Sequence, residues 1–230
     1  HFVEGVSTGL AALPRLAQLP DAWRQAWAQN RNDTDGFSAR WRLVLCLALA
    51  FGAAGLFRYA TQGWFARRLQ PDSPVFTSRL IASAWGVLQD LLTLALALLV
   101  LHAARRFWLP EIDIVVMTLR TIANGVAIGA GHLILGRFLL APGAPERRLM
   151  PLPRADRHFR VIALYGLVSP LLLTTAVTSL HVAGPGSVAG LFSLIGIGLP
   201  RFKAPCFIDA RHDIGALILR PAEEPGTGRK

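Results

Sequence analysis

The chain has 230 residues, of which 53% are hydrophobic and 17% charged, and its formal net charge is +10. Soluble domains usually have about 25% charged residues, so this composition excludes an ordinary soluble globular domain. Four stretches, 43–57, 80–104, 114–136 and 161–200, contain only two charged residues, Asp90 and Arg120. Apolar blocks between charged connectors are typical of an integral membrane protein. In lipid the backbone must satisfy its own hydrogen bonds, so helices are expected, and the alternation typical of membrane β-strands is absent.

Residues 1–40 are predicted to form an extracytoplasmic amphipathic segment. Apolar residues recur there every three or four positions, as on one face of a helix, at Leu10, Leu13, Leu16, Leu19, Trp23 and Trp27. Pro14 and Pro20 are expected to break this helix into pieces. The segment is expected to lie on the outer membrane surface or to pack on another domain.

The membrane region is predicted to cover residues 41–200, with helices at about 41–65, 80–104, 114–138 and 161–183 and a short fifth segment at 187–199. Gly184-Pro185-Gly186 predicts a tight turn before the fifth segment. A helix of about 13 residues is only about 20 Å long, against about 30 Å of hydrocarbon, so this segment is either re-entrant or truncated. The predicted fold is an all-α, polytopic membrane protein with four transmembrane helices and a short fifth.

Residues 201–230 are predicted to be a polar, disordered tail, because the run 221–228 is rich in proline, glycine and glutamate. The apolar pattern stops abruptly near Leu199. A truncated or frame-shifted gene would produce such a junction, and an apolar continuation in another downstream reading frame would support that hypothesis.

The arginines predict the orientation of the chain. Ten of them flank spans one and three on one side of the membrane, and five lie on the other side. The positive-inside rule then places the N-terminus outside and makes Arg67, Arg68, Arg147 and Arg148 cytoplasmic basic anchors. Arg58, about two turns from the end of the first span, is expected to extend to the headgroups.

The sequence offers no support for catalysis or for nucleic-acid binding. The GxSxG, HExxH and P-loop patterns are missing, and Gly129-Ala130-Gly131 lacks the spacing of a dinucleotide-binding loop. Cys46 and Cys206 lie on different segments and form no CxxC pair. The arginines are divided among short connectors instead of forming one basic surface. We therefore expect no enzymatic activity, no catalytic, cofactor or metal site, and no nucleic-acid partner.

Polar residues inside the spans are the main candidate functional residues, because they are costly in lipid: Asp90, Arg120, Asn124 and His132. Arg120 lies about 9 Å below the outer end of span three and can extend outward. By depth, Asn124 is the better partner for Asp90. Two interpretations remain open, a structural polar contact between helices and a proton or ion pathway through Asp90, Asn124 and His132.

Small residues and one proline predict how the helices pack. Gly125 and Gly129 form a GxxxG pattern, which favours close helix packing, with a pore-lining role as the alternative. Pro170 is expected to kink the fourth span.

The connector 139–152 (LLAPGAPERRLMPL), continuing through 155–160 (ADRHFR), resembles a linker in one family of bacterial membrane proteins. It is similar to the linker between accessory helices in large members of the small-conductance mechanosensitive channel family. The N-terminal stretch with Leu13-Pro14, Leu19-Pro20, Trp23 and Trp27 resembles the extracytoplasmic segment of that family. The resemblance covers about residues 10–199.

The resemblance implies a homo-oligomeric, heptameric channel of the bacterial inner membrane, which opens under bilayer tension and protects against osmotic stress. Its partners would be membrane lipids and copies of itself. The family's conducting helix and soluble β domain are not recognised after Leu199, so the chain would be the accessory membrane-sensor region. The alternative is a multi-pass transporter or a membrane assembly protein that uses the intramembrane polar residues.

Overall fold

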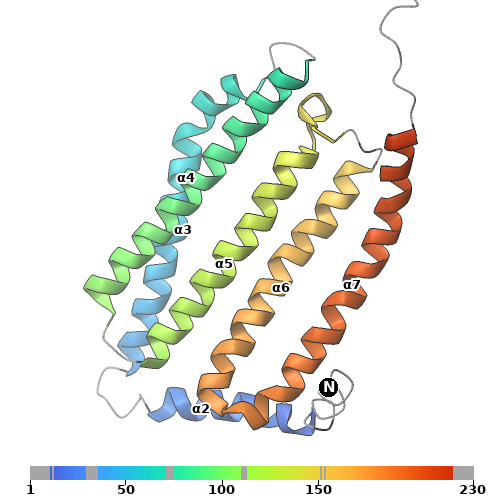
Figure 1. Cartoon of the computed structure of the whole chain (residues 1–230). Coiled ribbons are helices and arrows are strands. Elements are labelled where there is room, and N and C mark those ends of the chain that lie inside the picture. The colour runs from blue at the N-terminus through green and yellow to red at the C-terminus, as the bar shows by residue number, and fades with distance from the viewer. Residues whose placement is uncertain are drawn as a thin grey trace, which may run out of the picture.

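The computed structural model describes residues 13–29, 36–70, 75–109, 113–150 and 154–219, together with Ala11 and Leu152 (Figure 1). All regular elements in these ranges are helical, which confirms the all-α prediction. In chain order they are η1 (Leu13–Gln18), α2 (Leu19–Gln29), α3 (Gly36–Arg68), α4 (Phe76–Trp108), α5 (Asp113–Leu140), η2 (Pro145–Arg147), α6 (Ala155–Ala183) and α7 (Pro185–Leu219).

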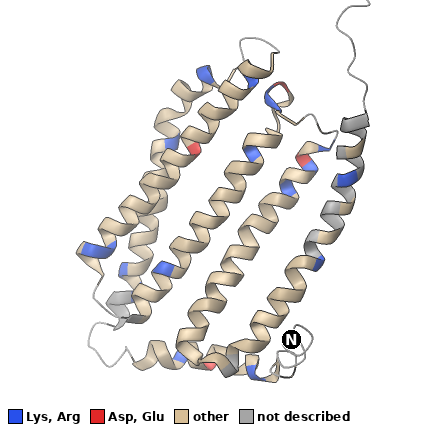
Figure 2. Cartoon of the chain, in the orientation of Figure 1, with Lys and Arg blue, Asp and Glu red and all other residues tan. Residues whose placement is uncertain are grey.

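Four helices are long and apolar enough to cross a membrane: Arg40–Arg68, Phe76–Trp108, Ile114–Leu140 and Ala155–Ala183. The shortest has 27 residues, or about 40 Å of helix, which exceeds the hydrocarbon thickness. The protein is therefore a multi-pass membrane protein, as predicted. The helices extend beyond the predicted spans because helical hydrogen bonding continues past the apolar residues into the charged ends. Figure 2 shows the long uncharged stretches between these ends.

The helices form two antiparallel hairpins, α3 with α4 and α5 with α6, and α7 lies beside α6 (Figure 1). Residues 69–70 and 75 and the described residues of the linker 141–154 lie at one end of the bundle, which we name the linker end; the opposite end is the α2 end. Packing is most extensive within each hairpin and sparser between α4 and α5. Large apolar side chains such as Leu56, Leu99 and Leu167 point outward, 68%, 65% and 64% exposed, as expected for a surface in contact with lipid.

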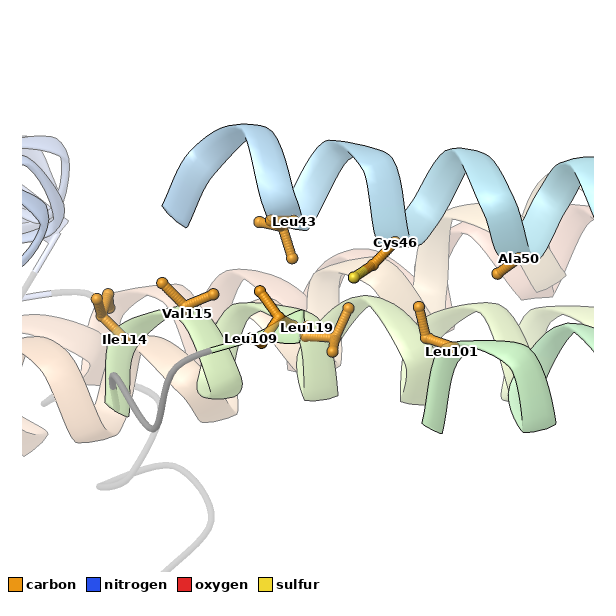
Figure 3. Close-up of a cluster of buried hydrophobic side chains, with 8 residues drawn as sticks. All are labelled: Leu43, Cys46, Ala50, Leu101, Leu109, Ile114, Val115 and Leu119. Atoms are coloured by element: carbon orange, nitrogen blue, oxygen red, sulfur yellow. The ribbon is translucent and has the colours of Figure 1, made fainter. Parts of the chain in front are cut away.

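A small hydrophobic core joins α3, α4 and α5 near the α2 end (Figure 3). Cys46 of α3 and Val115 of α5 are fully buried in it. The buried members are Leu43, Cys46, Ala50, Leu101, Leu109, Ile114, Val115 and Leu119. This core joins the two hairpins near the α2 end and does not extend to the linker end.

The N-terminal segment packs on the helices of this same chain. Figure 1 shows α2 crossing the end of the bundle, and the indole Nε1 of Trp23 donates a hydrogen bond to the Ser179 hydroxyl of α6 at 3.0 Å. The predicted interruption is present, because the chain is a 3₁₀ helix up to Gln18 and an α-helix from Leu19. Residues 1–10, 12 and 30–35 of the predicted segment lie outside the described residues.

The turn at Gly184 is present, and the predicted short apolar fifth segment is confirmed as the apolar stretch Val188–Arg201. Gly184 has φ +75°, a conformation that glycine adopts without strain, and α7 begins at Pro185. However, α7 continues through Leu219, across residues 201–219 that were predicted to be a disordered tail. These residues still alternate apolar and charged types, and the composition typical of disorder begins only near Pro221. Residues 220–230 lie outside the described residues.

Candidate functional site: a polar cluster between α3, α4 and α5

Asp90 of α4 is the centre of an ion-pair cluster that connects three helices. Its side chain is 10% exposed. The Nη1 atom of Arg58, on α3, donates to Asp90 Oδ1 at 2.6 Å. The Nη1 atom of Arg137, on α5, lies 3.1 Å from Oδ1 and 3.0 Å from Oδ2. One carboxylate therefore holds both hairpins together through charge-assisted hydrogen bonds, which are the stronger kind.

The two arginines reach Asp90 from different depths. Arg137 lies three residues before the end of α5, so its long side chain extends inward from the linker end. Arg58 lies about 15 Å before the end of α3. The Arg58 and Arg137 side chains are 49% and 43% exposed on the surface of the bundle, whereas the Asp90 side chain is 10% exposed. The cluster keeps a formal charge of +1.

A cavity of about 180 Å³ lies beside this cluster. Gln89 is 6% exposed and lines the cavity, and its carboxamide has no hydrogen-bond partner among the described residues. Ser83 is 7% exposed and donates a hydrogen bond to the Arg147 carbonyl at 3.2 Å. The cavity is lined by Arg58, Leu69, Ser83, Gly86, Val87, Gln89, Asp90, Ile134, Arg137, Phe138, Ala141, Pro142, Ala144 and Arg147.

The linker 141–154 forms one wall of the cavity and is held in place by Asp156. The carboxylate of Asp156 accepts from the Gly143 backbone N–H at 3.0 Å and from Arg148 Nη2 at 2.9 Å. Arg147 Nε is buried, lies 3.7 Å from Glu146 Oε1 and has no hydrogen-bond partner among the described residues. The predicted anchor Arg148 therefore organises the linker, whereas Arg147 lines the cavity.

The other two predicted anchors lie beside tryptophans at the same end of the bundle. The Arg68 guanidinium lies 4.5 Å from the Trp64 ring centre and 4.8 Å from that of Trp85, on α4. Such cation–π contacts attract a guanidinium to the ring faces, so Arg68 connects α3 to α4. Arg67 lines a surface groove next to this cluster. Tryptophans and arginines at a helix end are typical of the membrane interface.

The predicted pairing of Asp90 with Asn124 is wrong. Asn124 instead lines a groove between α5 and α6 toward the α2 end, together with Arg120 and His181. Arg137, which does contact Asp90, is thirteen residues further along α5, a rotation of about 220° around the helix. Asn124 therefore faces away from α4. Depth along the helices alone could not reveal this. Arg120 is exposed beside the same groove, so its extension to the headgroups stays a prediction.

His132 also lies away from Asp90. Its Nδ1 is 2.9 Å from the Ile128 carbonyl, and its ring centre is 6.0 Å from that of Tyr165, on α6. Asp90, Asn124 and His132 thus belong to separate environments, and the structure does not bring the predicted proton or ion pathway together.

The two glycines of the GxxxG pattern lie where α5 and α6 approach most closely. A Cβ atom on Gly129 would be 2.8 Å from the Gly166 carbonyl oxygen, and one on Gly125 would be 3.2 Å from Thr174 Oγ1. Pro170 is buried within α6 and has no N–H for the Gly166 carbonyl four residues before it. That carbonyl faces Gly129 instead, so these small residues serve helix packing. Whether Pro170 kinks the helix stays a prediction.

The comparisons with known proteins identify no family. No family model matches the chain, and neither a curated protein nor a solved structure matches it. The family resemblance therefore depends on the residues of the linker and the N-terminal segment alone. Among the described residues, no group of three or more His, Cys, Asp or Glu side chains is placed to hold a metal ion.

Four residues of the site were not among the predicted ones: Arg58, Ser83, Gln89 and Arg137. One signal in the sequence could have identified the arginines. Both lie on the same side of the membrane midplane as Asp90, and an intramembrane carboxylate requires a cation within reach of a long side chain. Ser83 and Gln89 give no comparable signal.

Proposed function

We propose that this chain is the membrane-sensor region of a tension-gated ion channel that acts in osmotic protection, with no enzymatic activity. In this proposal the chain resides in a bacterial inner membrane with its N-terminus outside, and it assembles with copies of itself. The conducting helix and the soluble β domain of the family would lie outside the segment that the resemblance covers.

The observation that carries the proposal is that the helices pack more extensively within each hairpin than between the two hairpins. Packing is extensive within α3–α4 and within α5–α6, but between α4 and α5 it is sparser. Toward the linker end, the contact between the hairpins includes the Asp90 ion pairs beside a cavity. Membrane tension favours the state with the larger in-plane area. A contact made of ion pairs and a cavity has less apolar packing to lose on separation than a filled core.

The N-terminal segment supports the proposal in a second way. The amphipathic helix α2 crosses the α2 end of the bundle and is tied to α6 by the Trp23–Ser179 hydrogen bond. An amphipathic helix at a membrane surface responds to lipid packing. A change in the bilayer at this surface would therefore act directly on the second hairpin.

The rival function, coupled transport, has less support. Asp90 is already held by two guanidinium groups. Asn124 and His132 lie at the α5–α6 contact, away from it.

Paired distance measurements on the full chain in proteoliposomes test the proposal. In a background where both native cysteines are replaced by serine, one probe pair, Tyr59→Cys with Leu135→Cys, spans the two hairpins. The control pair, Leu135→Cys with Leu164→Cys, lies within the second hairpin; all three positions are more than half exposed. On osmotic swelling we expect the first distance to lengthen and the second to stay constant. Distances that are unchanged in both pairs would contradict the sensor function.

A cellular test separates the two functions. Loss of the gene should lower survival after osmotic down-shock, and re-expression of the intact gene should restore it. Normal survival in cells carrying Asp90→Asn, combined with loss of a pH-dependent or substrate-dependent flux, would favour a transporter instead.

A further inference from the structure

We propose that the cavity between α3, α4, α5 and the linker 141–154 binds a phosphate group, carried either by a phospholipid headgroup or by free phosphate. The inference rests on the residues that line this cavity and does not depend on the proposed function.

Charge is the first observation. The cavity is lined by Arg58, Arg137 and Arg147 and by a single carboxylate, Asp90. These four side chains have a net formal charge of +2. Arginine presents several N–H donors in a planar fork that matches phosphate oxygens, and it is the residue most often used for this purpose.

The donors of these arginines are only partly used. Arg58 and Arg137 each contact Asp90 through Nη1 alone. Arg147 Nε has no hydrogen-bond partner among the described residues, although Glu146 Oε1 lies 3.7 Å away. The remaining guanidinium N–H groups of Arg58 and Arg137 can hold a phosphate from α3 and α5 without breaking the ion pairs of Asp90, and Arg147 adds its positive charge from the linker, although its Nε is enclosed by protein.

Gln89 is the second, independent observation. The residue is 6% exposed, and it is one of the residues that line the cavity. Its carboxamide is not among the fully enclosed polar groups without a partner in the described part of the chain, so it is open to a group bound in the cavity. The amide N–H₂ can donate to a phosphate oxygen, and the position of Gln89 next to Asp90 directs the bound group toward the arginines.

The place and size of the cavity fit a phosphate at the membrane surface. A volume of about 180 Å³ holds one phosphate group with some water. The cavity lies at the end of the α3–α4 hairpin that also carries Trp64, Trp85 and Arg68, residue types typical of the headgroup level. Basic pockets between transmembrane helices are known to bind lipid headgroups.

The test uses the full purified chain with two probes. The first is inorganic phosphate added to the protein in a neutral detergent. The second is a comparison of nanodiscs made of phosphatidylcholine alone with nanodiscs that also contain phosphatidylglycerol. Ligand binding raises the midpoint of thermal unfolding by an amount that grows with the logarithm of 1 + [ligand]/Kd, so a titration of the shift gives the dissociation constant for phosphate. For the lipid, the measured quantity is the shift in midpoint and the amount of phosphatidylglycerol retained after extraction.

Arg147→Gln, Gln89→Leu and a matched control, Arg106→Gln, separate the site from general charge. Arg106 is exposed at the α2 end of α4, far from the cavity. Arg147→Gln should weaken binding about tenfold or more, because a charged hydrogen bond is lost. Gln89→Leu should weaken it severalfold while leaving every ion pair in place, and the control should bind normally.

The outcomes are distinct. A response to phosphatidylglycerol alone assigns the site to a lipid headgroup, and saturable binding of inorganic phosphate assigns it to a soluble phosphate. The proposal is overturned if neither probe binds, or if Arg106→Gln weakens binding as much as Arg147→Gln does.

Discussion

Replacing Gly129 with alanine tests whether α5 and α6 can approach so closely because Gly129 has no side chain. The added methyl group would lie 2.8 Å from the Gly166 carbonyl oxygen, whereas ordinary contacts begin near 3.4 Å. The two helices must therefore separate by about 0.6 Å, or bend locally, to admit it. The obstacle is backbone, so no side-chain rotation can relieve the clash.

The expected magnitude follows from two opposing effects. Overpacking a tight contact costs about 1–3 kcal/mol. Alanine in place of glycine within a helix stabilises the folded state by about 0.5–1 kcal/mol, because the unfolded chain has less conformational freedom to lose. The free energy of unfolding of Gly129→Ala should therefore fall by about 1–2 kcal/mol.

Gly131→Ala is the matched control. It lies two residues away on the same helix, and its Cβ would meet nothing within 4 Å. This variant has the propensity gain without the clash, so the difference between the two variants isolates the α5–α6 contact at about 1–3 kcal/mol. Reversible unfolding in mixed detergent and SDS micelles measures both. Equal stability of the two variants would refute the packing argument.

Three further predictions concern polar contacts. Asp90→Asn removes the charge shared by Arg58 and Arg137, and it should lower the free energy of unfolding by about 1–3 kcal/mol, because hydrogen bonds to a charged group are lost and both guanidinium groups lose their counter-charge; unchanged micelle stability would contradict the cluster. Trp23→Phe should cost about 0.5–1.5 kcal/mol in the same assay. Asp156→Asn should change global stability little, since its side chain is 57% exposed, but amide exchange in residues 143–148 should accelerate severalfold.

The sequence predicted the spans because hydropathy reports burial in lipid, which every helix experiences in the same way. It placed four helices correctly, and Gly184-Pro185-Gly186 correctly located the turn before α7. It failed at the end of α7, because the criterion was hydropathy and the helix continues where hydropathy falls. Helical hydrogen bonds do not require an apolar sequence, so the end of an apolar block is a poor marker of a helix end.

The direction in which a side chain points around its helix axis explains why the glycine packing face was predicted correctly and the partner of Asp90 was not. The GxxxG pattern defines one helix face by itself, so Gly125 and Gly129 identified a packing surface without knowledge of the neighbour. The partner of Asp90 depends on which faces of three helices meet, and no local pattern states this. Depth favoured Asn124, yet the contact is made by Arg137, whose side chain reaches inward from near the end of α5.

The Asp90 cluster and the cavity beside it connect the two proposals thermodynamically. A phosphate held by Arg58, Arg137 and Arg147 would bridge α3, α5 and the linker, which lie on both sides of the contact between the hairpins. Separating the hairpins would pull these arginines apart and weaken the site. Binding and separation are then reciprocal: if tension-induced separation lowers phosphate affinity by a given factor, bound phosphate opposes separation by that same factor. The Tyr59–Leu135 distance should therefore lengthen less at equal swelling when the cavity is occupied, and Gln89→Leu should raise severalfold the phosphate concentration at which this difference appears.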